Sequence, residues 1–336
     1  MSELNKIALK ILENGKGILA ADESTGTMTK RLQNVNVVST PENRILFRET
    51  LFSSKSMSKC IGGVILYDET IKQKTKDGKK IPELLSESGS ISGIKVDTGA
   101  KQMAGSSDEK ITEGLDGLRD RLKEYSKLGA KFTKWRGVYN ISNNHPSKLS
   151  IHANAHALAR YAALVQECNM VPIVEPEVLM DGSHSADECF NKTSAVIKKC
   201  FEELILHNTD LTGIILKPNM ILAGTKCKNQ ISNEETAKQT IKCLKDSVPS
   251  EVPGVAFLSG GQSEIQATEN LNLINKFNNT NFVMSYSYGR ALQQSALKHW
   301  SKNINDINGT QKVFDHRATM CTLAAKGKWS KELENN

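Results

Sequence analysis

Short apolar runs rich in β-branched residues recur along this 336-residue chain, and longer polar segments with apolar residues at helical spacing separate them. The runs predict eight buried strands, at residues 17–21, 61–66, 91–96, 130–133, 171–174, 213–216, 255–258 and 282–285. The segments between them predict helices over 43–59, 113–128, 152–168, 185–207, 234–247 and 263–277. The connection from the second to the third run is less regular, because turn signals occur at Asp77-Gly78 and Ser88-Gly89.

Strands that alternate with helices imply parallel βαβ units, which either close into a barrel or form an open, doubly wound sheet. No glycine-rich dinucleotide fingerprint follows the first run, which counts against the open alternative. We therefore predict an α/β protein with a (β/α)8 TIM barrel in a single domain over residues 1–336. Within it we expect a short N-terminal helix, the barrel over about 15–302, and a C-terminal helix with a truncated tail over about 303–336.

The distribution of apolar residues and cysteines bears on the cellular compartment. The apolar runs are too short to span a bilayer, and the first residues lack the basic start and apolar stretch of a signal peptide. The seven cysteines are scattered with no CxxC pair, which suits reduced thiols in the cytosol better than disulfides or a zinc framework. We expect a cytoplasmic protein that does not bind membranes.

The formal net charge is +7, which is either an ordinary solvated surface or a field that attracts anionic substrates. Charge alone does not distinguish a phosphorylated sugar from nucleic acid. Aromatic residues are only 5% of the chain, and no basic block is interleaved with them. These features make a nucleic-acid groove the weaker interpretation.

The residues that end the apolar runs are the first sign of chemistry. Successive members from Lys95 onward, up to the serine that ends the seventh run, lie 39, 41, 42 and 42 residues apart. That nearly constant step is what one βα unit for each step would give. The carboxyl ends of barrel strands meet at one face, where the active site lies. The residues concerned are Asp22, Lys95, Lys134, Glu175, Lys217 and Ser259, with Arg290 after the eighth run.

Side chains alternate across a strand, so each of three charged pairs shares one face. The pairs are Lys95 and Asp97, Lys134 and Arg136, and Glu175 and Glu177. One such pair by itself is more often a structural ion pair or an exposed charge. Six strands that end in ionisable or hydroxyl residues favour a functional cluster at the mouth of the barrel.

A lysine in this cluster could act as a nucleophile. Desolvation and nearby cations lower the pKa of a lysine and free its amine. Lys217 follows the apolar residues Ile214, Ile215 and Leu216 and precedes Pro218, so it emerges from a buried strand. Spacing alone does not choose among Lys95, Lys134 and Lys217, and each could instead pair with a carboxylate for structure.

Imine chemistry needs both an acid and a base, because carbinolamine formation and its dehydration move protons in opposite senses. The carboxylates Asp22, Glu175 and Glu177 could supply both.

Two segments have features of a phosphate site. Ser259, Gly260 and Gly261 form a glycine turn between a strand and a helix, where backbone N–H groups can approach an anion. Residues 287–290 open the last barrel helix, and there Ser287 and Gly289 precede the guanidinium of Arg290. A lone Ser-Gly-Gly is usually only a turn, but the loops after strands seven and eight are where barrels often bind phosphate.

We predict no metal site and no cofactor. His152 and His156 are four residues apart like metal ligands on a helix, but Ala153 stands where the acid of the zinc motif would be. An ordinary helix surface is the better interpretation of this pair.

Read together, these segments resemble class I fructose-1,6-bisphosphate aldolases over roughly residues 5 to 328. The stretches that carry the resemblance are GKGILAADESTGTMTKRL (15–32), ENRILFRETLF (42–52), GIKVD (93–97), KWRGVY (134–139), VPIVEPEVL (171–179), LKPNM (216–220), FLSGGQSE (257–264) and SYGRAL (287–292). Several of them are long and specific, so chance agreement at all of them is not credible.

The resemblance implies a role for each site residue. Lys217 of LKPNM would form the Schiff base, Glu175 would act as acid and base with Glu177 beside it, and Asp22 and Lys134 would complete the catalytic set. The contacts to one phosphate would come from Ser259, Gly260, Gly261, Ser287 and Arg290. Those to the other would come from Ser24, Thr27 and Lys95, with Arg31 nearby.

Three departures from the family pattern are visible. Thr27 stands where the family usually has serine, which keeps the hydroxyl. Thr98 stands where the family has lysine, so one positive charge is lost. Family members finish in a flexible tail with a terminal tyrosine, whereas the printed residues 332–336 contain none; on this basis we expect slow protonation of the enamine intermediate.

The implied function is reversible cleavage of fructose 1,6-bisphosphate to dihydroxyacetone phosphate and glyceraldehyde 3-phosphate, in glycolysis and gluconeogenesis. The resemblance also implies a phosphorylated sugar substrate, a homotetramer and a cytoskeletal partner such as actin. Another Schiff-base barrel lyase and a zinc-dependent aldolase are alternatives, although the latter needs a histidine-rich site. A third is a catalytically reduced scaffold that binds proteins, which would have no reason to hold Asp22, Lys134, Glu175 and Lys217 together.

Overall fold

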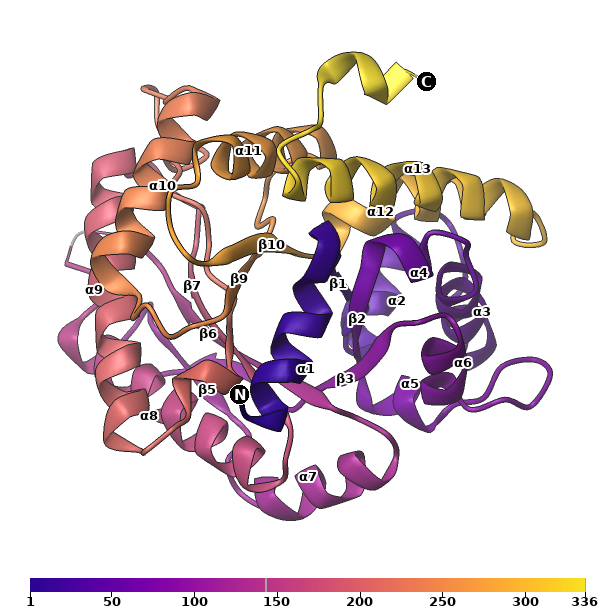
Figure 1. The fold of residues 1–336 in the computed structure, drawn as a ribbon, viewed down its shortest axis with the longest axis horizontal. Coiled ribbons are helices and arrows are strands. Elements are labelled where there is room, and N and C mark those ends of the chain that lie inside the picture. The colour runs from indigo at the N-terminus through magenta and orange to yellow at the C-terminus, as the bar shows by residue number, and fades with distance from the viewer. Residues whose placement is uncertain (143, 336) are drawn as a thin grey trace.

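The eight predicted strands form a closed, parallel barrel at the centre of the computed structural model, which describes residues 1–142 and 144–335 (Figure 1). Because β1 pairs with both β2 and β10, the sheet closes on itself, which confirms the predicted single-domain (β/α)8 barrel and excludes an open sheet. The last residue of the predicted tail, Asn336, lies outside the described residues. The strands, in barrel order, are β1 (Gly17–Ala20), β10 (Val283–Tyr288), β9 (Gly254–Phe257), β8 (Ile215–Leu216), β7 (Val171–Val178), β6 (Phe132–Tyr139), β3 (Ile91–Lys95) and β2 (Ile61–Leu66).

Three strands run further than their apolar runs predict, since β6, β7 and β10 continue to Tyr139, Val178 and Tyr288. β6 and β7 pair along their whole length, from Phe132 opposite Val171 to Tyr139 opposite Val178. The predicted ends at 133 and 174 are therefore wrong, because charged residues that face each other inside the barrel continue the ladder. β8 is shorter than predicted, since Leu211–Gly213 form a 3₁₀ turn (η2) before it.

Helices lie outside the barrel and connect its strands (Figure 1). The connecting helices are α2 (Thr25–Gln33), α3 (Pro41–Phe52), α4 (Met57–Cys60), α5 (Asp68–Lys72), α6 (Ile81–Glu87), α7 (Leu118–Lys127), α8 (Lys148–Glu167), α9 (Ala186–Leu206), α10 (Asn233–Ser247) and α11 (Glu264–Phe277). After β10 come α12 (Arg290–Trp300), α13 (Ile307–Ala325) and the 3₁₀ segment η3 (Lys331–Asn335).

Two of the predicted helices need correction. The segment 43–59 is two helices, because Ser53 and Ser54 close a turn after α3. The segment 113–128 becomes helical only at α7, since Gly114 and Gly117 have φ of 125° and 65°, which an α-helix does not accommodate. The residues before them form an antiparallel hairpin of β4 (Gly99–Gln102) and β5 (Lys110–Glu113), which the apolar pattern does not predict.

The N-terminal helix α1 (Glu3–Leu12) lies across the amino-terminal end of the barrel (Figure 1). Its residues Ala8, Ile11 and Leu12 pack on inward-facing strand residues such as Phe132 in an inner core. A Cβ on Gly62 would lie 1.9 Å from the backbone oxygen of Ile11, so glycine is what lets α1 lie this close. The helix therefore closes one end and leaves the opposite end for a site.

Alternation along each strand carries one face from the inner core to the open end of the barrel. On β6, Phe132 belongs to the inner core, and Lys134 and Arg136 follow on the same face, whereas Trp135 packs outward with the helices. On β7, Ile173 likewise precedes Glu175. The barrel is apolar near α1 and charged at the carboxyl ends of its strands.

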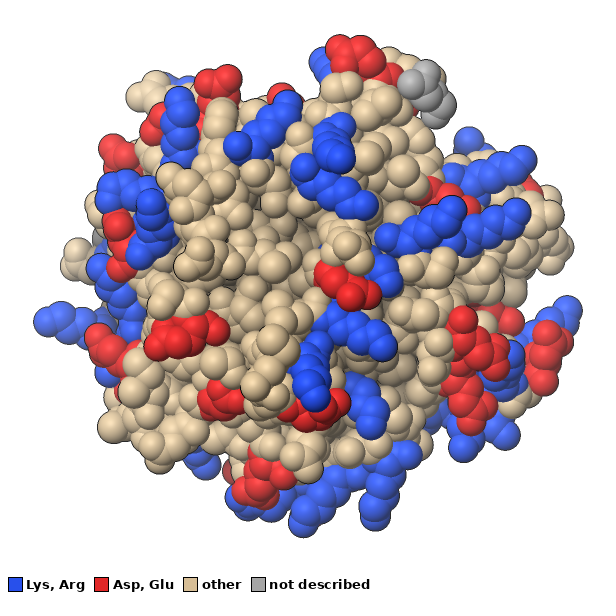
Figure 2. Space-filling model, in the orientation of Figure 1, with Lys and Arg blue, Asp and Glu red and all other residues tan. Residues whose placement is uncertain are grey.

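The surface that carries α1 has basic and acidic side chains interspersed with uncharged residues (Figure 2). The net positive charge is thus not gathered into one patch on this face. In the part of the chain that the structure describes, no helix is both long and apolar enough to span a membrane.

Candidate active site

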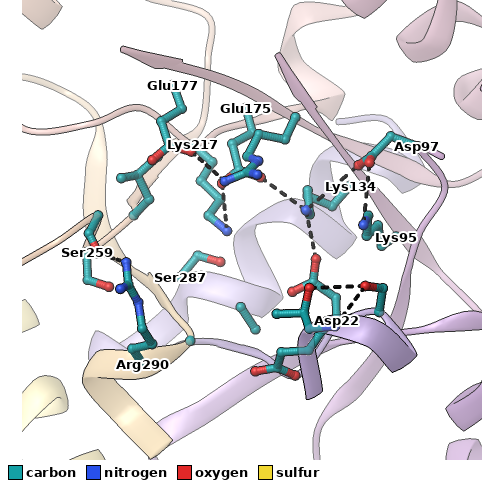
Figure 3. A pocket seen from close by; sticks show the side chains of 18 of the residues that line it. Asp22, Lys95, Asp97, Lys134, Glu175, Glu177, Lys217, Ser259, Ser287 and Arg290 are labelled. Atoms are coloured by element: carbon teal, nitrogen blue, oxygen red, sulfur yellow. Dashed lines mark hydrogen bonds and ion pairs between the residues drawn. The ribbon is translucent and has the colours of Figure 1, made fainter. Parts of the chain in front are cut away.

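A cavity of about 230 Å³ opens at the carboxyl ends of the barrel strands (Figure 3). Fourteen of the fifteen predicted site residues line it: Asp22, Ser24, Thr27, Arg31, Lys95, Lys134, Glu175, Glu177, Lys217, Ser259, Gly260, Ser287, Gly289 and Arg290. The exception is Gly261, whose N–H points to the Met180 Sδ atom at 2.9 Å. Residues more than 260 positions apart in the chain therefore converge in one charged cavity.

Lys217 lies at the base of this cavity, directly after β8. Its ammonium Nζ is 3.1 Å from Glu175 Oε1, and its side chain is only 5% exposed. The other oxygen, Glu175 Oε2, is 3.4 Å from Lys134 Nζ and accepts no hydrogen bond from the described residues. One carboxylate thus bridges two lysines in a nearly dry environment and keeps an oxygen available for another donor.

Lys134 is the most heavily paired of the three lysines. Its Nζ is 2.7 Å from Asp22 Oδ2, 3.4 Å from Glu175 and 3.9 Å from Asp97. Burial alone would lower the pKa of Lys134, but these carboxylates outweigh it and raise the pKa well above its usual value. This environment therefore favours the positively charged form of Lys134.

Burial and the neighbouring cations act in opposite directions on the pKa of each carboxyl group, and the balance differs among them. Burial raises the pKa of Asp22, but Lys134, Lys217 and Lys95 together bring it below its usual range. The net shift of the Glu175 pKa is also downward, because Lys217 and Lys134 outweigh its burial. Burial raises the pKa of Glu177 despite the charge of Arg136, whose Nη1 donates to Glu177 at 2.9 Å. Two neighbouring carboxyl groups on β7 thus differ in their affinity for a proton.

On one side of the cavity, the loops after β9 and β10 lie together. Arg290 Nη2 donates to the backbone oxygen of Gly260 at 2.6 Å, and the rest of its guanidinium is exposed toward the cavity mouth (Figure 3). Ser287 is buried, and its hydroxyl has no hydrogen-bond partner among the described residues. Gly289 is the N-cap of α12 and supplies no side-chain cap, so the first N–H groups of that helix are available to an anion.

On the other side, the N-terminus of α2 and the end of β3 supply hydroxyl and cationic groups. Ser24 caps α2 by accepting from the Thr27 N–H, and the two hydroxyls lie 3.1 Å apart. Arg31 lies on the same helix and forms an ion pair with the buried Glu23. Lys95 Nζ is 3.5 Å from Asp97. Both sides of the cavity therefore offer the donors that a phosphate group binds.

The rest of the lining comes from Ala20, Glu23, Asp97, Gly99, Ala100, Arg136 and Leu258. Glu23 is not among the predicted site residues. It contacts both Arg31 and the fully buried Arg48, and it therefore positions Arg31. Thr98, where the family lysine is replaced, is exposed and donates its N–H to the Glu113 backbone oxygen on the hairpin, outside the lining.

A closed (β/α)8 barrel with a charged cavity at the carboxyl ends of its strands is the architecture of a barrel enzyme. The chain belongs to the class I fructose-bisphosphate aldolases, because the model of the family Glycolytic, described as fructose-bisphosphate aldolase class-I, matches residues 3–336. This confirms the resemblance found in the sequence and the assignment to a lyase of glycolysis.

Individual relatives agree with the family model over nearly the whole chain. A probable fructose-bisphosphate aldolase class 1 of Xanthomonas campestris pv. campestris is 48% identical over 98% of this chain and 99% of its own. Fructose-bisphosphate aldolase 4, cytosolic, of Arabidopsis thaliana is 48% identical over 93% of this chain and 80% of its own. The solved fructose-bisphosphate aldolase of Plasmodium falciparum, in complex with TRAP and a small-molecule inhibitor, has a TM-score of 0.96 at 44% identity, covering 98% and 95% of the two chains.

Proposed function

We propose that this protein cleaves fructose 1,6-bisphosphate reversibly through a Schiff base on Lys217. The observation that carries the proposal is the contact of 3.1 Å between Lys217 Nζ and a Glu175 oxygen inside a cavity that has phosphate-binding groups on two sides. Lys217 contacts a single carboxylate, whereas Lys134 is surrounded by three. Lys95 also contacts one carboxylate, Asp97, at 3.5 Å, but its side chain is 18% exposed, whereas that of Lys217 is 5% exposed. Lys217 is thus the candidate lysine that is both buried and paired with only one carboxylate.

The reaction begins when the Lys217 amine attacks the ketone carbon of the open-chain sugar. Glu175 protonates the departing hydroxyl of the carbinolamine, water leaves, and an iminium forms. The bond between C3 and C4 then breaks, with its electron pair flowing into the iminium, as a carboxylate takes the proton of the C4 hydroxyl. Glyceraldehyde 3-phosphate leaves, and protonation of the enamine followed by hydrolysis releases dihydroxyacetone phosphate and restores Lys217.

Two carboxylates are candidates for the C4 proton. Glu175 has a free oxygen, Oε2, directed to the side of Lys134. Asp22 lies 2.7 Å from the same lysine, and its pKa, like that of Glu175, is lowered by the neighbouring lysines. Lys134 and Lys95 supply fixed positive charge for the oxygens that become negative as the bond breaks.

The Schiff base is tested by borohydride reduction in the presence of dihydroxyacetone phosphate, followed by peptide mass mapping. We expect a stable adduct on Lys217, and we expect Lys217→Ala to abolish both the adduct and turnover. Lys134→Met is the matched control, since it removes a buried lysine 3.4 Å from the same glutamate and should slow turnover while the Lys217 adduct still forms. An adduct on Lys134 or Lys95 in the unaltered protein would overturn the assignment.

A second experiment separates the two carboxylates. If Glu175 moves the protons of carbinolamine dehydration, Glu175→Gln should slow adduct formation as well as cleavage. If Asp22 is the base for the C4 hydroxyl, Asp22→Asn should leave adduct formation with dihydroxyacetone phosphate nearly unchanged and lower only the rate of cleavage. If both variants slow adduct formation and cleavage by the same factor, Glu175 and Asp22 do not have separate roles in these two steps.

We also propose a cytoplasmic location and a homotetramer, and we keep a cytoskeletal partner as a hypothesis. The location is supported by the Arabidopsis relative, which is named cytosolic. Leu149, Ile205 and Leu206 are large apolar side chains that are more than half exposed at the ends of α8 and α9, which is typical of a subunit contact. Light scattering after gel filtration measures the oligomeric state, and a monomer at micromolar concentration would contradict the tetramer.

A further inference from the structure

Four ionisable residues from two neighbouring helices meet on the outside of the barrel, away from the cavity. His152 and His156 are one turn apart on α8, and Glu203 lies one turn before His207 at the end of α9. The two helices run side by side on the outer layer (Figure 1). None of these residues lines the active-site cavity, and the proposed reaction uses none of them.

The separations within this cluster fit a metal ion. His156 Nδ1 is 3.1 Å from Glu203 Oε2, and His152 Nδ1 is 3.2 Å from Glu203 Oε1. One ligand atom each from His156, Glu203 and His207 can be chosen so that all lie within 4.8 Å of one another. Ligands at about 2.0–2.2 Å from a common ion are held a little over 3 Å apart in a tetrahedral site, so small side-chain movements would complete the geometry.

One ring nitrogen of His207 is held by the backbone, which leaves the other as its potential metal ligand. Its Nδ1 lies 2.8 Å from the backbone oxygen of Glu203, and because a carbonyl only accepts, Nδ1 must carry the proton. The other ring nitrogen, Nε2, is then the one with a free lone pair. A histidine that donates one nitrogen to a carbonyl and offers the other to the ion is the common outer-shell arrangement of zinc sites. Its ring packs edge-on against His156, with centroids 4.9 Å apart.

Glu203 is placed to supply a carboxylate oxygen. Its side chain is 4% exposed, and Lys199 Nζ lies 3.0 Å from Oε1, which leaves Oε2 on the side of His156. The two carboxylate oxygens of Glu203 thus each face one histidine of α8.

We propose that His156, Glu203 and His207 bind a divalent transition-metal ion of the zinc class and link α8 to α9. Two imidazoles and one carboxylate suit Zn²⁺, Co²⁺ or Ni²⁺ rather than Ca²⁺ or Mg²⁺, which prefer oxygen ligands only. The fourth position would be taken by His152 or by water. The prediction of an ordinary helix surface rests on His152 and His156 alone. Glu203 and His207 lie about fifty residues further along the chain, and they come close to these histidines only because α9 packs on α8.

The test uses the full chain without a histidine tag. One equivalent of Zn²⁺ should bind in calorimetry and raise the Tm, and Co²⁺ should give the visible absorption of a tetrahedral site with no sulfur-to-metal charge-transfer band. His207→Gln should weaken Zn²⁺ binding by more than about 10- to 100-fold, since a change even in an outer-shell partner costs that much. Glu203→Gln should abolish the rise in Tm.

His299→Gln is the matched control. Its Nε2 lies 2.9 Å from Asp306, so it is also a surface histidine paired with a carboxylate, but the described residues place no third ligand beside it. This variant should bind Zn²⁺ as the unaltered protein does. All variants should keep aldol cleavage, because the cluster lies outside the cavity, and their circular dichroism checks that each one folds.

Three results would overturn the proposal. The first is the absence of Zn²⁺ and Co²⁺ binding at micromolar concentration. The second is a double variant, His156→Gln with His207→Gln, that binds Zn²⁺ as tightly as the unaltered protein does. The third is binding that disappears in Cys227→Ser, since Cys227 is a partly exposed thiol and would then be the ligand. A ligand variant that no longer binds Zn²⁺ but still cleaves the sugar supports the proposed metal site, because its loss of metal binding is then not a result of misfolding.

Discussion

Replacing Arg290 with alanine should weaken substrate binding far more than it changes the chemical step. Arg290 lines the cavity where α12 begins, and one of its N–H groups donates to Gly260 at 2.6 Å. This bond fixes the guanidinium at the cavity that Ser287 also lines, and the Ser287 hydroxyl has no hydrogen-bond partner among the described residues. The remaining N–H donors are left for a phosphate, to which a planar fork binds in bidentate fashion.

The expected size follows from that contact. A hydrogen bond to a charged group contributes about 1.5–3 kcal/mol, which corresponds to a change of roughly 10- to 150-fold in kcat/KM. Arg290 is exposed in the described structure, so the lower part of this range is expected. Since phosphate binding is present in both the ground state and the transition state, most of the loss should appear as a higher KM.

The assay compares fructose 1,6-bisphosphate with fructose 1-phosphate in three proteins: the unaltered chain, Arg290→Ala and Arg290→Lys. If Arg290 binds the phosphate that the two sugars share, Arg290→Ala should raise both KM values by the same factor. If it binds the phosphate at C6, only the bisphosphate should be affected. Arg290→Lys keeps the charge but loses the fork, and it should fall between the other two proteins.

Arg119→Ala is the control for a general loss of positive charge. Arg119 pairs with Glu167 on the outer surface, away from the cavity, and its removal should leave KM unchanged. Added salt should raise the KM of the unaltered protein more than that of Arg290→Ala. An unchanged KM for both sugars in Arg290→Ala, or an equal rise in Arg119→Ala, would refute the reasoning.

Three further predictions concern the framework of the site. Asp22→Asn should cost about 1–3 kcal/mol at pH 7, because Lys134 loses its nearest partner. Since the folded pKa of Asp22 is lowered, its stabilisation is present above the unfolded value of 3.8 and is lost below it. The difference between the two proteins in urea titrations should therefore shrink as the pH falls through that value, and a constant difference would contradict the prediction. Gly62→Ala should destabilise the fold by about 1–3 kcal/mol, because its Cβ would meet the Ile11 oxygen at 1.9 Å, whereas Gly26→Ala meets nothing within 4 Å and should be neutral or stabilising; equal Tm values in the two variants would contradict this account of α1. Glu334→Ala should speed proteolysis near η3, because Glu334 accepts two hydrogen bonds from the buried Arg317, and an unchanged cleavage rate would show that other contacts hold the segment.

The sequence by itself determined the barrel and the charged residues that gather at its open end. Apolar runs of four to six residues predict buried strands because burial on both faces of a parallel strand leaves no place for polar side chains. The polar residue that ends each run therefore lies at the carboxyl end of its strand, where the barrel is open. For this reason Asp22, Lys134, Glu175 and Lys217 could be named as one cluster before any coordinates were known.

The sequence did not determine how far some elements extend. β6 and β7 continue beyond their apolar runs because Arg136 lies opposite Glu175 in the ladder and donates to Glu177. A charge inside a strand is stable only when its partner is present, and that partner lies about forty residues away in the chain. The hairpin of β4 and β5 is likewise polar and short, so its pattern carries no period that could be recognised.

Only the tertiary structure decided which charged residues contact one another and how deeply each is buried. Spacing left Lys95, Lys134 and Lys217 as equivalent candidates, and the structure separates them by ion pairing and by burial. Lys134 contacts three carboxylates, whereas Lys95 and Lys217 contact one each and only Lys217 of these two is buried. Glu203 is a second example, because its sequence position indicates only an ordinary helix residue. Its contact with His156 exists only because α9 packs on α8. Ionisation and metal binding depend on distances of a few ångströms between side chains, and the packing of distant elements, rather than their local sequence, sets those distances.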